Sequence, residues 1–563
     1  MALGMPQLID AGIPAAPDMD AVAQRYRAFE QSLQSGSPAT WLPTFRAWDE
    51  LRRELDTWSS LTHVRFTQDT RDAAARAAVD RRDELEPTLT GFDIDLKRRF
   101  VTSSERSSLA ANLGDHAFRL WETDLSTFDP VVEPDLIAES KLGSEYTQLL
   151  AGIQVDFDGE SLNLSALGRY GSDPDRSRRH GAATAKWNAL GGRGAELDRI
   201  FDELVHVRDG IARKLGFASF TELGYARMQR VDYDRAAVER YRDAVVAEVV
   251  PLANAIAQRA AKRHGIAHLA LWDEQLLAAA PSPRPLGDAR WIMDRTIESF
   301  ADLDPRLGEF VRMMDGNELT DLVARAGKAG GGYCTKLASY GVPFIFTNFN
   351  GTKGDITVLM HELGHAFQGY SSRNQPVIDY LTPTLESAEV HSMSLEYLTW
   401  PFMERFFGDG AQTYRESHLS EALLFLPYGV AVDHFQHLIY EHPNATPAER
   451  HAMWQSMERR YLPWRNYGDL ERPAQGAFWQ GQTHIYRVPF YYIDYTLALC
   501  CALQMWASSY DDPSGTLERY VALCARGGEA AFRNLITSAG LTSPFDPGAL
   551  SRVVARAKDV LGA

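Results

Sequence analysis

The sequence predicts a mostly α-helical protein with a small β-sheet near its centre, and three observations lead to this fold class. Apolar residues recur at three- and four-residue steps with charged residues between them, for example Phe45, Trp48, Leu51, Leu55 and Trp58, which is the spacing of an amphipathic helix. Similar spacing covers roughly 20–33, 68–120, 195–228, 235–265, 290–325, 385–407, 446–461 and 515–560. Strand-like sequence is scarce, and its best example is VPFIFTNF at 342–349, rich in aromatic and β-branched residues.

The length of the chain predicts more than one domain or a multi-lobed fold. A chain of 563 residues exceeds what one hydrophobic core usually covers. Two stretches resemble loops, GRYGSDPDRSRRHG at 168–181 and the glycine-rich AGKAGGGYC at 326–334. We expect the first to separate an N-terminal helical region, 1–190, from the remainder, 191–563.

Composition narrows the classes of partner and compartment. The net charge is −17, from 58 basic and 75 acidic residues, which argues against a nucleic-acid binder or a protein of anionic membranes. The four cysteines form no CxxC pair and no legible disulfide framework. The first residues, MALGMPQLIDAGIP, lack the basic and apolar regions of a leader peptide, and no stretch approaches a membrane span. A reduced, cytoplasmic location is expected.

The stretch HELGH at 361–365 carries the main chemical hypothesis. It follows a loop, and the sequence places an N-cap at Asp355 and a helix end near Gly369. His361 and His365 are four residues apart, so both imidazoles leave the same helix face, as two ligands of one Zn²⁺ require. Glu362 could reach a metal-bound water as a general base without binding the metal. An accidental HExxH on a surface helix is the alternative, but the apolar flanks make this helix largely buried.

A catalytic zinc site needs a third protein ligand, expected downstream. The stretch TPTLESAEVHSMSLEYLTW at 382–400 has helical spacing and offers Glu386, Glu389, His391 and Glu396. Glu389 and Glu396 are seven apart and therefore share a face, while Glu386 is turned away. One carboxylate on that face would bind metal and the second could hydrogen-bond a ligand histidine. Spacing alone does not choose between Glu386 and Glu389.

Three stretches together resemble the thimet oligopeptidase and oligoendopeptidase F family of zinc metallopeptidases, with the bacterial oligoendopeptidase F branch the nearer. They are GKAGGGYCTKL, VPFIFTNFNGTKGDITVLMHELGHAFQ and ESAEVHSMSLEY. The resemblance implies a third ligand about 25 residues after the second histidine and another glutamate seven residues later. Glu389 lies 24 residues after His365 and Glu396 seven further on, so the resemblance favours Glu389 and leaves Glu386 in reserve.

A second stretch, THIYRVPFYYIDYTLA at 483–498, is similar to the family segment in which a histidine and clustered tyrosines face the zinc. Attack of water on an amide produces a tetrahedral oxyanion, which a phenol O–H can stabilise. The candidates are His484, Tyr486, Tyr491, Tyr492 and Tyr495, with His484 and Tyr495 favoured. The alternative for any one tyrosine is an ordinary place in an aromatic core.

The resemblance implies one Zn²⁺ per chain, a two-lobed helical body with a deep central channel, and a catalytic metallopeptidase domain over 191–563. It implies an endopeptidase acting on internal bonds of short, unstructured oligopeptides. A helical HExxH metallocarboxypeptidase and an inactive peptide-binding homologue are the alternatives. The oligomeric state is left open. We also expect the 342–349 strand to pair by its edge with substrate backbone, and the 326–334 loop to be mobile.

Overall fold

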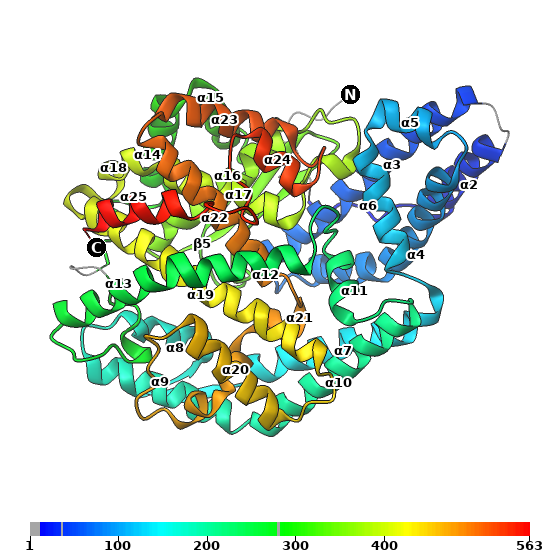
Figure 1. The fold of residues 1–563 in the computed structure, drawn as a ribbon. Coiled ribbons are helices and arrows are strands. Elements are labelled where there is room, and N and C mark those ends of the chain that lie inside the picture. The colour runs from blue at the N-terminus through cyan, green and yellow to red at the C-terminus, as the bar shows by residue number, and fades with distance from the viewer. Residues whose placement is uncertain (1–11, 35–37, 278–281, 563) are drawn as a thin grey trace. The chain divides into compact units, whose positions relative to one another are not determined.

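The structure is a computed structural model, and it describes residues 12–34, 38–277 and 282–562 (Figure 1). The chain forms two compact units, each assembled from three separate segments. The first unit comprises 1–125, 283–411 and 508–541, and the second comprises 126–282, 412–507 and 542–563. The units alternate along the chain, and the sequence-based division at residue 190 stays a prediction. Residues 1–11, which make up most of the stretch MALGMPQLIDAGIP, lie outside the described residues.

The first unit is helical with one small sheet, as the sequence predicts. Its main elements are α2 (Met19–Gln34), α3 (Pro38–Gln68), α4 (Ala73–Thr102), α5 (Arg106–Leu113), α6 (Asp115–Ser126), α14 (Ala289–Leu303), α15 (Pro305–Gly316), β3 (Thr320–Val323), β4 (Tyr333–Leu337), β5 (Val342–Phe349), α16 (Lys353–Ser371), α17 (Leu385–Leu398), α18 (Glu404–Phe407), α23 (Pro513–Arg526) and α24 (Phe532–Ser538).

The second unit is also helical, with one short hairpin. Its main elements are α7 (Glu133–Ala151), β1 (Gln154–Phe157), β2 (Glu160–Asn163), α8 (Leu164–Leu167), α9 (Arg176–Gly191), α10 (Gly194–Lys214), α11 (Phe220–Arg227), α12 (Arg235–Ala244), α13 (Val250–Arg263), α19 (Ala411–Glu441), α20 (Pro447–Tyr461), the 3₁₀ turn η9 (Phe478–Gly481), α21 (Thr483–Arg487), α22 (Tyr492–Ser509) and α25 (Ser551–Leu561).

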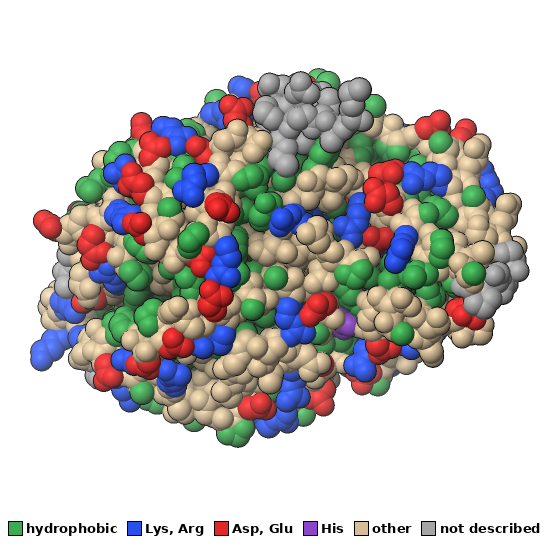
Figure 2. Space-filling model, turned by 90° about the horizontal axis from the view of Figure 1, so that it is seen from above, with side chains coloured by type: hydrophobic (Ala, Val, Ile, Leu, Met, Phe, Trp, Pro, Cys, Tyr) green, Lys and Arg blue, Asp and Glu red, His purple; other side chains and the backbone are tan. Residues whose placement is uncertain are grey.

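No helix among the described residues combines the length and apolarity that crossing a bilayer demands. On the face drawn in Figure 2, acidic and basic side chains of the described residues alternate over short distances. Charges of both signs are therefore mixed on that face.

The expected loop at 168–181 is partly wrong, because α9 begins within it at Arg176. Asp175 caps this helix by accepting a hydrogen bond from the backbone N–H of Ser177. Arg176 and Arg179 both form ion pairs at 2.8 Å with Asp273, whose side chain is fully buried. Arg176 and Arg179 therefore have a structural role, and local turn propensity does not reveal their pairing with the distant Asp273.

The apolar spacing of 45–58 produces the core of the N-terminal helices. Phe45, Trp48 and Leu51 of α3 are almost completely buried. They form one cluster with residues of α2, α4 and α6, including Phe100 and Trp121. This confirms the helix predicted from their spacing.

A buried ion pair fastens α3 to the segment that follows the HELGH helix. Arg52 donates to both carboxylate oxygens of Asp379 at 2.8 and 2.7 Å, and its Nε lies 3.3 Å from Asp93. The side chains of Arg52 and Asp379 are 9% and 16% exposed. Burial alone would raise the pKa of Asp379, but the charge and hydrogen bonds of Arg52 lower it well below its usual range.

The central sheet has the order β3-β5-β4, with β5 in the middle. β5 spans the predicted 342–349, whereas the short strands β3 and β4 were not predicted. β3 runs parallel to β5 and β4 antiparallel to it. Phe344 and Phe346 of β5 pack with Val64 of α3, and α16 also packs against β5. The prediction of a small sheet beside the HELGH helix is confirmed.

The expectation that 342–349 offers an edge to substrate is wrong, because both edges of β5 already carry a strand. Among the described residues, β4 is paired on one edge only. The backbone N–H of Ile345 donates to the carbonyl of Leu319 on the β3 side, so Ile345 and the opposing Cys334 form a non-hydrogen-bonded pair. The N–H and C=O of Cys334 therefore point to the open edge of β4.

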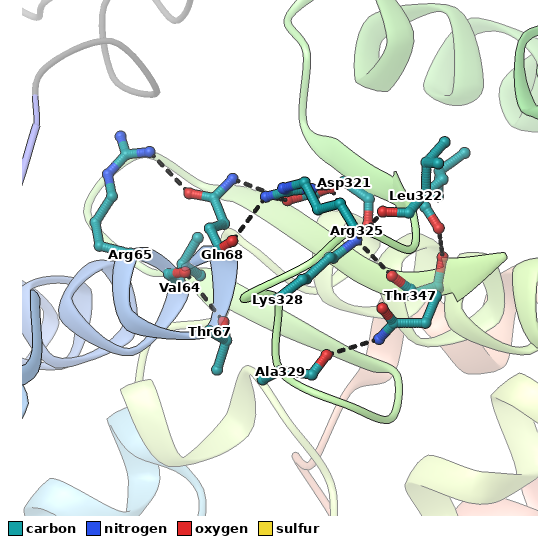
Figure 3. A network of polar contacts seen from close by, with 12 residues as sticks. Val64, Arg65, Thr67, Gln68, Asp321, Leu322, Arg325, Lys328, Ala329 and Thr347 are labelled. Atoms are coloured by element: carbon teal, nitrogen blue, oxygen red, sulfur yellow. Dashed lines mark hydrogen bonds and ion pairs between the residues drawn. The ribbon is translucent and has the colours of Figure 1, made fainter. Parts of the chain in front are cut away.

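The glycine-rich loop before β4 is fastened by polar contacts, which favours a fixed loop over the mobile one expected (Figure 3). The buried ammonium of Lys328 donates to the carbonyls of Asp321 at 2.9 Å and Thr347 at 2.6 Å. The backbone N–H of Ala329 donates to the carbonyl of Thr67 at the end of α3. Asn348 donates to the carbonyl of Gly331.

Replacement of Asp379 by Ala should destabilise the first unit by about 3 kcal/mol, because Arg52 would keep its buried charge with one close partner fewer. The matched control is Glu54→Ala, which removes an exposed partner of Arg25 and should cost about 0–1 kcal/mol. Thermal unfolding at neutral pH measures both. Because the native pKa of Asp379 is lowered, its contribution is present above about pH 4 and is lost as the pH falls further. Equal effects of the two substitutions would contradict this role.

Candidate functional site

Helix α16 carries the HELGH residues, and its start differs slightly from the prediction. The helix begins at Lys353, two residues before the expected cap. Asp355 instead lies in the first turn, where its carboxylate accepts hydrogen bonds from the backbone N–H groups of Asn350 and Gly351 at 3.0 and 2.8 Å. Asp355 therefore fixes the loop that joins β5 to α16. Its negative charge also interacts favourably with the positive, N-terminal end of the helix dipole.

The structure brings His361, His365 and Glu389 together. Their ligand atoms all lie within 4.8 Å of one another. Nε2 of His361 is 3.3 Å and Nε2 of His365 is 3.6 Å from the same oxygen of Glu389. Glu386, the reserve candidate, is buried on α17 but does not belong to this group.

A second carboxylate orients the first histidine. Oε1 of Glu396 lies 2.7 Å from Nδ1 of His361, which leaves Nε2 facing Glu389 and His365. The hydroxyl of Ser392 donates to Glu389 at 3.0 Å. A carboxylate behind a ligand histidine fixes the ring and increases its basicity. This is the contact that the seven-residue spacing of Glu389 and Glu396 suggested.

The close approach of α16 and α17 depends on Gly364 in the middle of HELGH. A Cβ atom at this position would lie 2.6 Å from Cα of Ser392 and 2.7 Å from the carbonyl oxygen of His391. Neither backbone atom can move aside cheaply. Gly364 therefore lets the helix carrying Glu389 lie against the helix carrying the histidines.

The charge state of the group fits a cation. Burial lowers the pKa of His361, but hydrogen bonds to Glu389 and Glu396 reverse this effect and raise it well above its usual value. Burial raises the pKa of Glu389, yet the two histidines bring it well below its usual range. An imidazole and a carboxylate held this close together are stabilised by a positive charge between them, which either a bound proton or a divalent metal ion can supply. Two nitrogens and one oxygen are a donor set that suits Zn²⁺.

Glu362 follows His361 on α16, and its carboxylate interacts electrostatically with both histidines and with Glu389. Its side chain is buried, and Oε2 has no hydrogen-bond partner among the described residues. Burial is the main cause that raises its pKa above the usual value, which suits a general base working near neutral pH. Gly332 lies close to Glu362. A Cβ atom at Gly332 would be in van der Waals contact with Oε1 of Glu362 at 3.7 Å and with Val358 at 3.4 Å, and its absence leaves that volume open.

The second unit gathers His484 with three of the predicted tyrosines. The ring centroid of His484 lies 5.8 Å from Tyr491, 5.1 Å from Tyr492 and 5.9 Å from Tyr495. Tyr486 is not among them: it is fully buried and stacks on Tyr146 at 3.8 Å. The core alternative therefore applies to Tyr486. This cluster lies in the second unit, and the His361–His365–Glu389 group lies in the first.

A strained turn fixes the direction in which α22 presents its tyrosines. Phe490 is fully buried and has a φ of 67°, a left-handed conformation that is uncommon for a bulky residue. Its N–H donates to Oε1 of Gln436 at 2.7 Å, and its carbonyl accepts from Arg230. Arg230 also forms a buried ion pair at 2.7 Å with Asp494. Gln436 and Arg230 could not be identified from the sequence, since no local pattern links them to this turn.

Comparisons with known proteins agree with this geometry. Residues 15–128 match the family described as the Peptidase M3 N-terminal domain, and residues 307–553 match Peptidase family M3. A crystal structure provisionally named oligoendopeptidase F is 46% identical in sequence to this chain. The alignment covers 98% of this chain and 97% of the other, and the two structures superpose with a TM-score of 0.91. PZ peptidase A with an inhibitor is 43% identical, with coverage of 97% and 98% and a TM-score of 0.91.

Two further relatives extend the comparison. A provisionally named oligoendopeptidase F from Bacillus anthracis str. Ames is 41% identical, with coverage of 97% of each chain and a TM-score of 0.86. Oligopeptidase PepF of Bacillus subtilis (strain 168) is 22% identical over 260 residues, which are 45% of this chain and 38% of that protein. The matched region thus spans less than half of this curated relative. Taken with the near-complete structural matches, these findings show that the chain belongs to peptidase family M3.

Proposed function

We propose that this protein is a zinc-dependent endopeptidase that hydrolyses internal bonds of short, unstructured oligopeptides. The observation that carries the proposal is the group of His361, His365 and Glu389. Beside it lies Glu362, whose buried Oε2 has no hydrogen-bond partner among the described residues. The names of the similar structures, oligoendopeptidase F and PZ peptidase A, support a peptide as substrate.

In this proposal His361, His365 and Glu389 hold one Zn²⁺, and Glu396 orients His361. When bound, zinc would supply Lewis acidity, polarising a carbonyl oxygen and lowering the pKa of water. Glu362 takes a proton from the attacking water and later gives it to the departing amine. Tyr491, Tyr492, Tyr495 and His484 are the candidates for donating hydrogen bonds to the oxyanion, and Tyr495 with His484 are favoured.

The open edge of β4 is a second part of the proposal, replacing the role first expected of β5. Backbone groups of Cys334 point to this edge, and the strand begins next to Gly332, which lies close to Glu362. An extended peptide paired with β4 would bring one of its bonds near the base. Hydrogen bonds to the peptide main chain do not depend on the side chains of the substrate, which suits an enzyme that accepts many sequences.

The alternatives differ in measurable ways. A metallocarboxypeptidase needs a free C-terminus, whereas the proposed endopeptidase should cut internally in peptides of roughly 6–20 residues blocked at both ends; the resemblance implies this length range. An inactive homologue would bind such peptides without product. Mass spectrometry of a blocked-peptide digest separates the three, and cleavage only after unblocking the C-terminus would overturn the proposal.

Metal binding should distinguish the three buried glutamates of α17. Glu389→Ala should lose tight zinc binding because two protein ligands remain, whereas Glu386→Ala should retain it. Glu396→Ala should weaken zinc affinity by about 10–100-fold, since only the support of His361 is lost. Competition with a chromogenic chelator measures all three affinities. Loss of zinc from the Glu386 variant alone would transfer the ligand role to Glu386.

Replacement of Glu362 by Gln should leave fold and zinc content unchanged and lower kcat by several orders of magnitude. The amide keeps the shape of the side chain but cannot accept the proton from water. Glu386→Gln is the matched control, because it changes another buried glutamate of the same unit and should retain activity. Retention of more than about a tenth of kcat in the Glu362 variant would show that the base is another group.

Backbone pairing with β4 predicts an alternating response to N-methylation of the peptide. Successive amides of an extended strand point to opposite sides. Single N-methyl groups scanned along a blocked peptide should therefore weaken binding at every second position near the cleaved bond. Affinity is measured with the Glu362→Gln variant, so that cleavage does not interfere. Uniform tolerance of methylation along the peptide would remove β4 from the binding site.

A further inference from the structure

We propose that Gln482 is a positioning residue that holds His484 as the neutral tautomer with its hydrogen on Nε2, and that Tyr428 fixes the orientation of Gln482. The inference rests on the proposed function, in which His484 contacts the peptide. In this tautomer His484 donates a hydrogen bond to a substrate oxygen and does not accept a proton there. All three residues lie in the second unit.

Two hydrogen bonds in series carry the inference. Nε2 of Gln482 lies 2.8 Å from Nδ1 of His484. The hydroxyl of Tyr428 donates to Oε1 of Gln482, also at 2.8 Å. A side-chain amide nitrogen can only donate, so Nδ1 of His484 must accept with its lone pair. In a neutral imidazole the remaining hydrogen is then on Nε2.

Tyr428 decides which end of the Gln482 amide faces the histidine. Burial raises the pKa of Tyr428 far above its usual value, so its hydroxyl keeps its hydrogen and needs an acceptor. Among the described residues that acceptor is Oε1 of Gln482. Reversing the amide would place N–H groups against this hydroxyl and leave its hydrogen without an acceptor. The guanidinium of Arg465 lies over the Tyr428 ring at 5.8 Å and packs it further.

The backbone keeps Gln482 and His484 in fixed relation. Gln482 occupies the N-cap position of α21, and its N–H donates to the carbonyl of Trp479 at 2.9 Å. Its own carbonyl accepts from Ile485 at 3.1 Å. The carbonyl of His484 accepts from Val488 at 2.9 Å. Both side chains therefore extend from one hydrogen-bonded turn.

Nε2 of His484 is available to donate a hydrogen bond to a ligand. Within the described part of the chain, no hydrogen bond is formed to its Nε2, whereas Nδ1 is used by Gln482. Burial lowers the pKa of His484, so the ring is neutral near pH 7. Among the described residues, the titratable side chains whose rings lie within 6 Å of the His484 ring are those of Tyr491, Tyr492 and Tyr495. A neutral Nε2–H among phenols is suited to an oxyanion.

Gln482→Glu tests the inference through the pH dependence of kcat. The introduced carboxylate can accept from Tyr428 and from Nδ1–H, so it should raise the pKa of His484. Below that raised pKa the imidazolium still carries a hydrogen on Nε2. Above it the neutral ring keeps its hydrogen on Nδ1, and Nε2 can no longer donate. The variant should therefore lose about 10²-fold in kcat as the pH rises, with little change in KM.

The control for this substitution is Gln455→Glu on α20, where the glutamine donates to the carbonyl of Ala474 and, among the described residues, forms no hydrogen bond to His484. Its kcat should follow the wild-type pH profile. Thermal unfolding of both variants shows whether the fold is retained. A profile of Gln482→Glu that coincides with that of the control would overturn the inference.

A second measurement reads the tautomer without catalysis. Long-range ¹H–¹⁵N correlation spectra of ¹⁵N-histidine-labelled protein, assigned with His484→Gln, should show Nε2–H in the wild type. Tyr428→Phe should produce a mixture of tautomers, because the amide is then free to reverse. Nδ1–H in the wild type would overturn the inference even if the enzyme is active.

Failure of the proposed function would be seen differently. His484→Gln and Tyr495→Phe, assayed in parallel on a blocked peptide, report on the oxyanion role itself. Unchanged kcat in both would remove that role from this cluster. The spectra would still decide the tautomer of His484.

Discussion

Two helices can share one metal ion only if their backbones lie close enough for short side chains to meet, and this constraint governs the first unit. Gly364 permits the contact by leaving the space that any Cβ would fill against α17. The contact allows His361 to reach Glu389 on one side of its ring and Glu396 on the other. The surrounding sheet and helices hold this pair of helices in place, with β5 and α3 on one flank.

Much of this site could be predicted because its geometry is local to two helices. The spacing of His361 and His365 fixes a shared face, and the seven-residue spacing of Glu389 and Glu396 fixes another. The choice of Glu389 over Glu386 needed the family resemblance, since both glutamates are buried on the same helix.

The parts that sequence could not predict depend on distant partners. β3 and β4 are four and five residues long, and they become strands by pairing with β5. Periodicity identifies a strand but does not say how many neighbours it has, which is why the open edge was assigned to the wrong strand. In the same way the partnership of Gln482 with Tyr428 joins residues 54 apart, and no local pattern announces it.

The order of the segments along the chain has a consequence for how the protein is made. The metal-site helices α16 and α17 end at residue 398, but α23, which packs against α16 and whose Tyr520 donates to the carbonyl of His391, begins only at residue 513. A ribosome releases the chain from its N-terminus, so the histidines and glutamates emerge more than a hundred residues before their covering helix. During that interval the nascent first unit lacks α23, the helix that packs against α16. Contacts between segments so far apart in sequence form slowly, so α16 and α17 remain without this covering helix at least until residues 513–526 have been made.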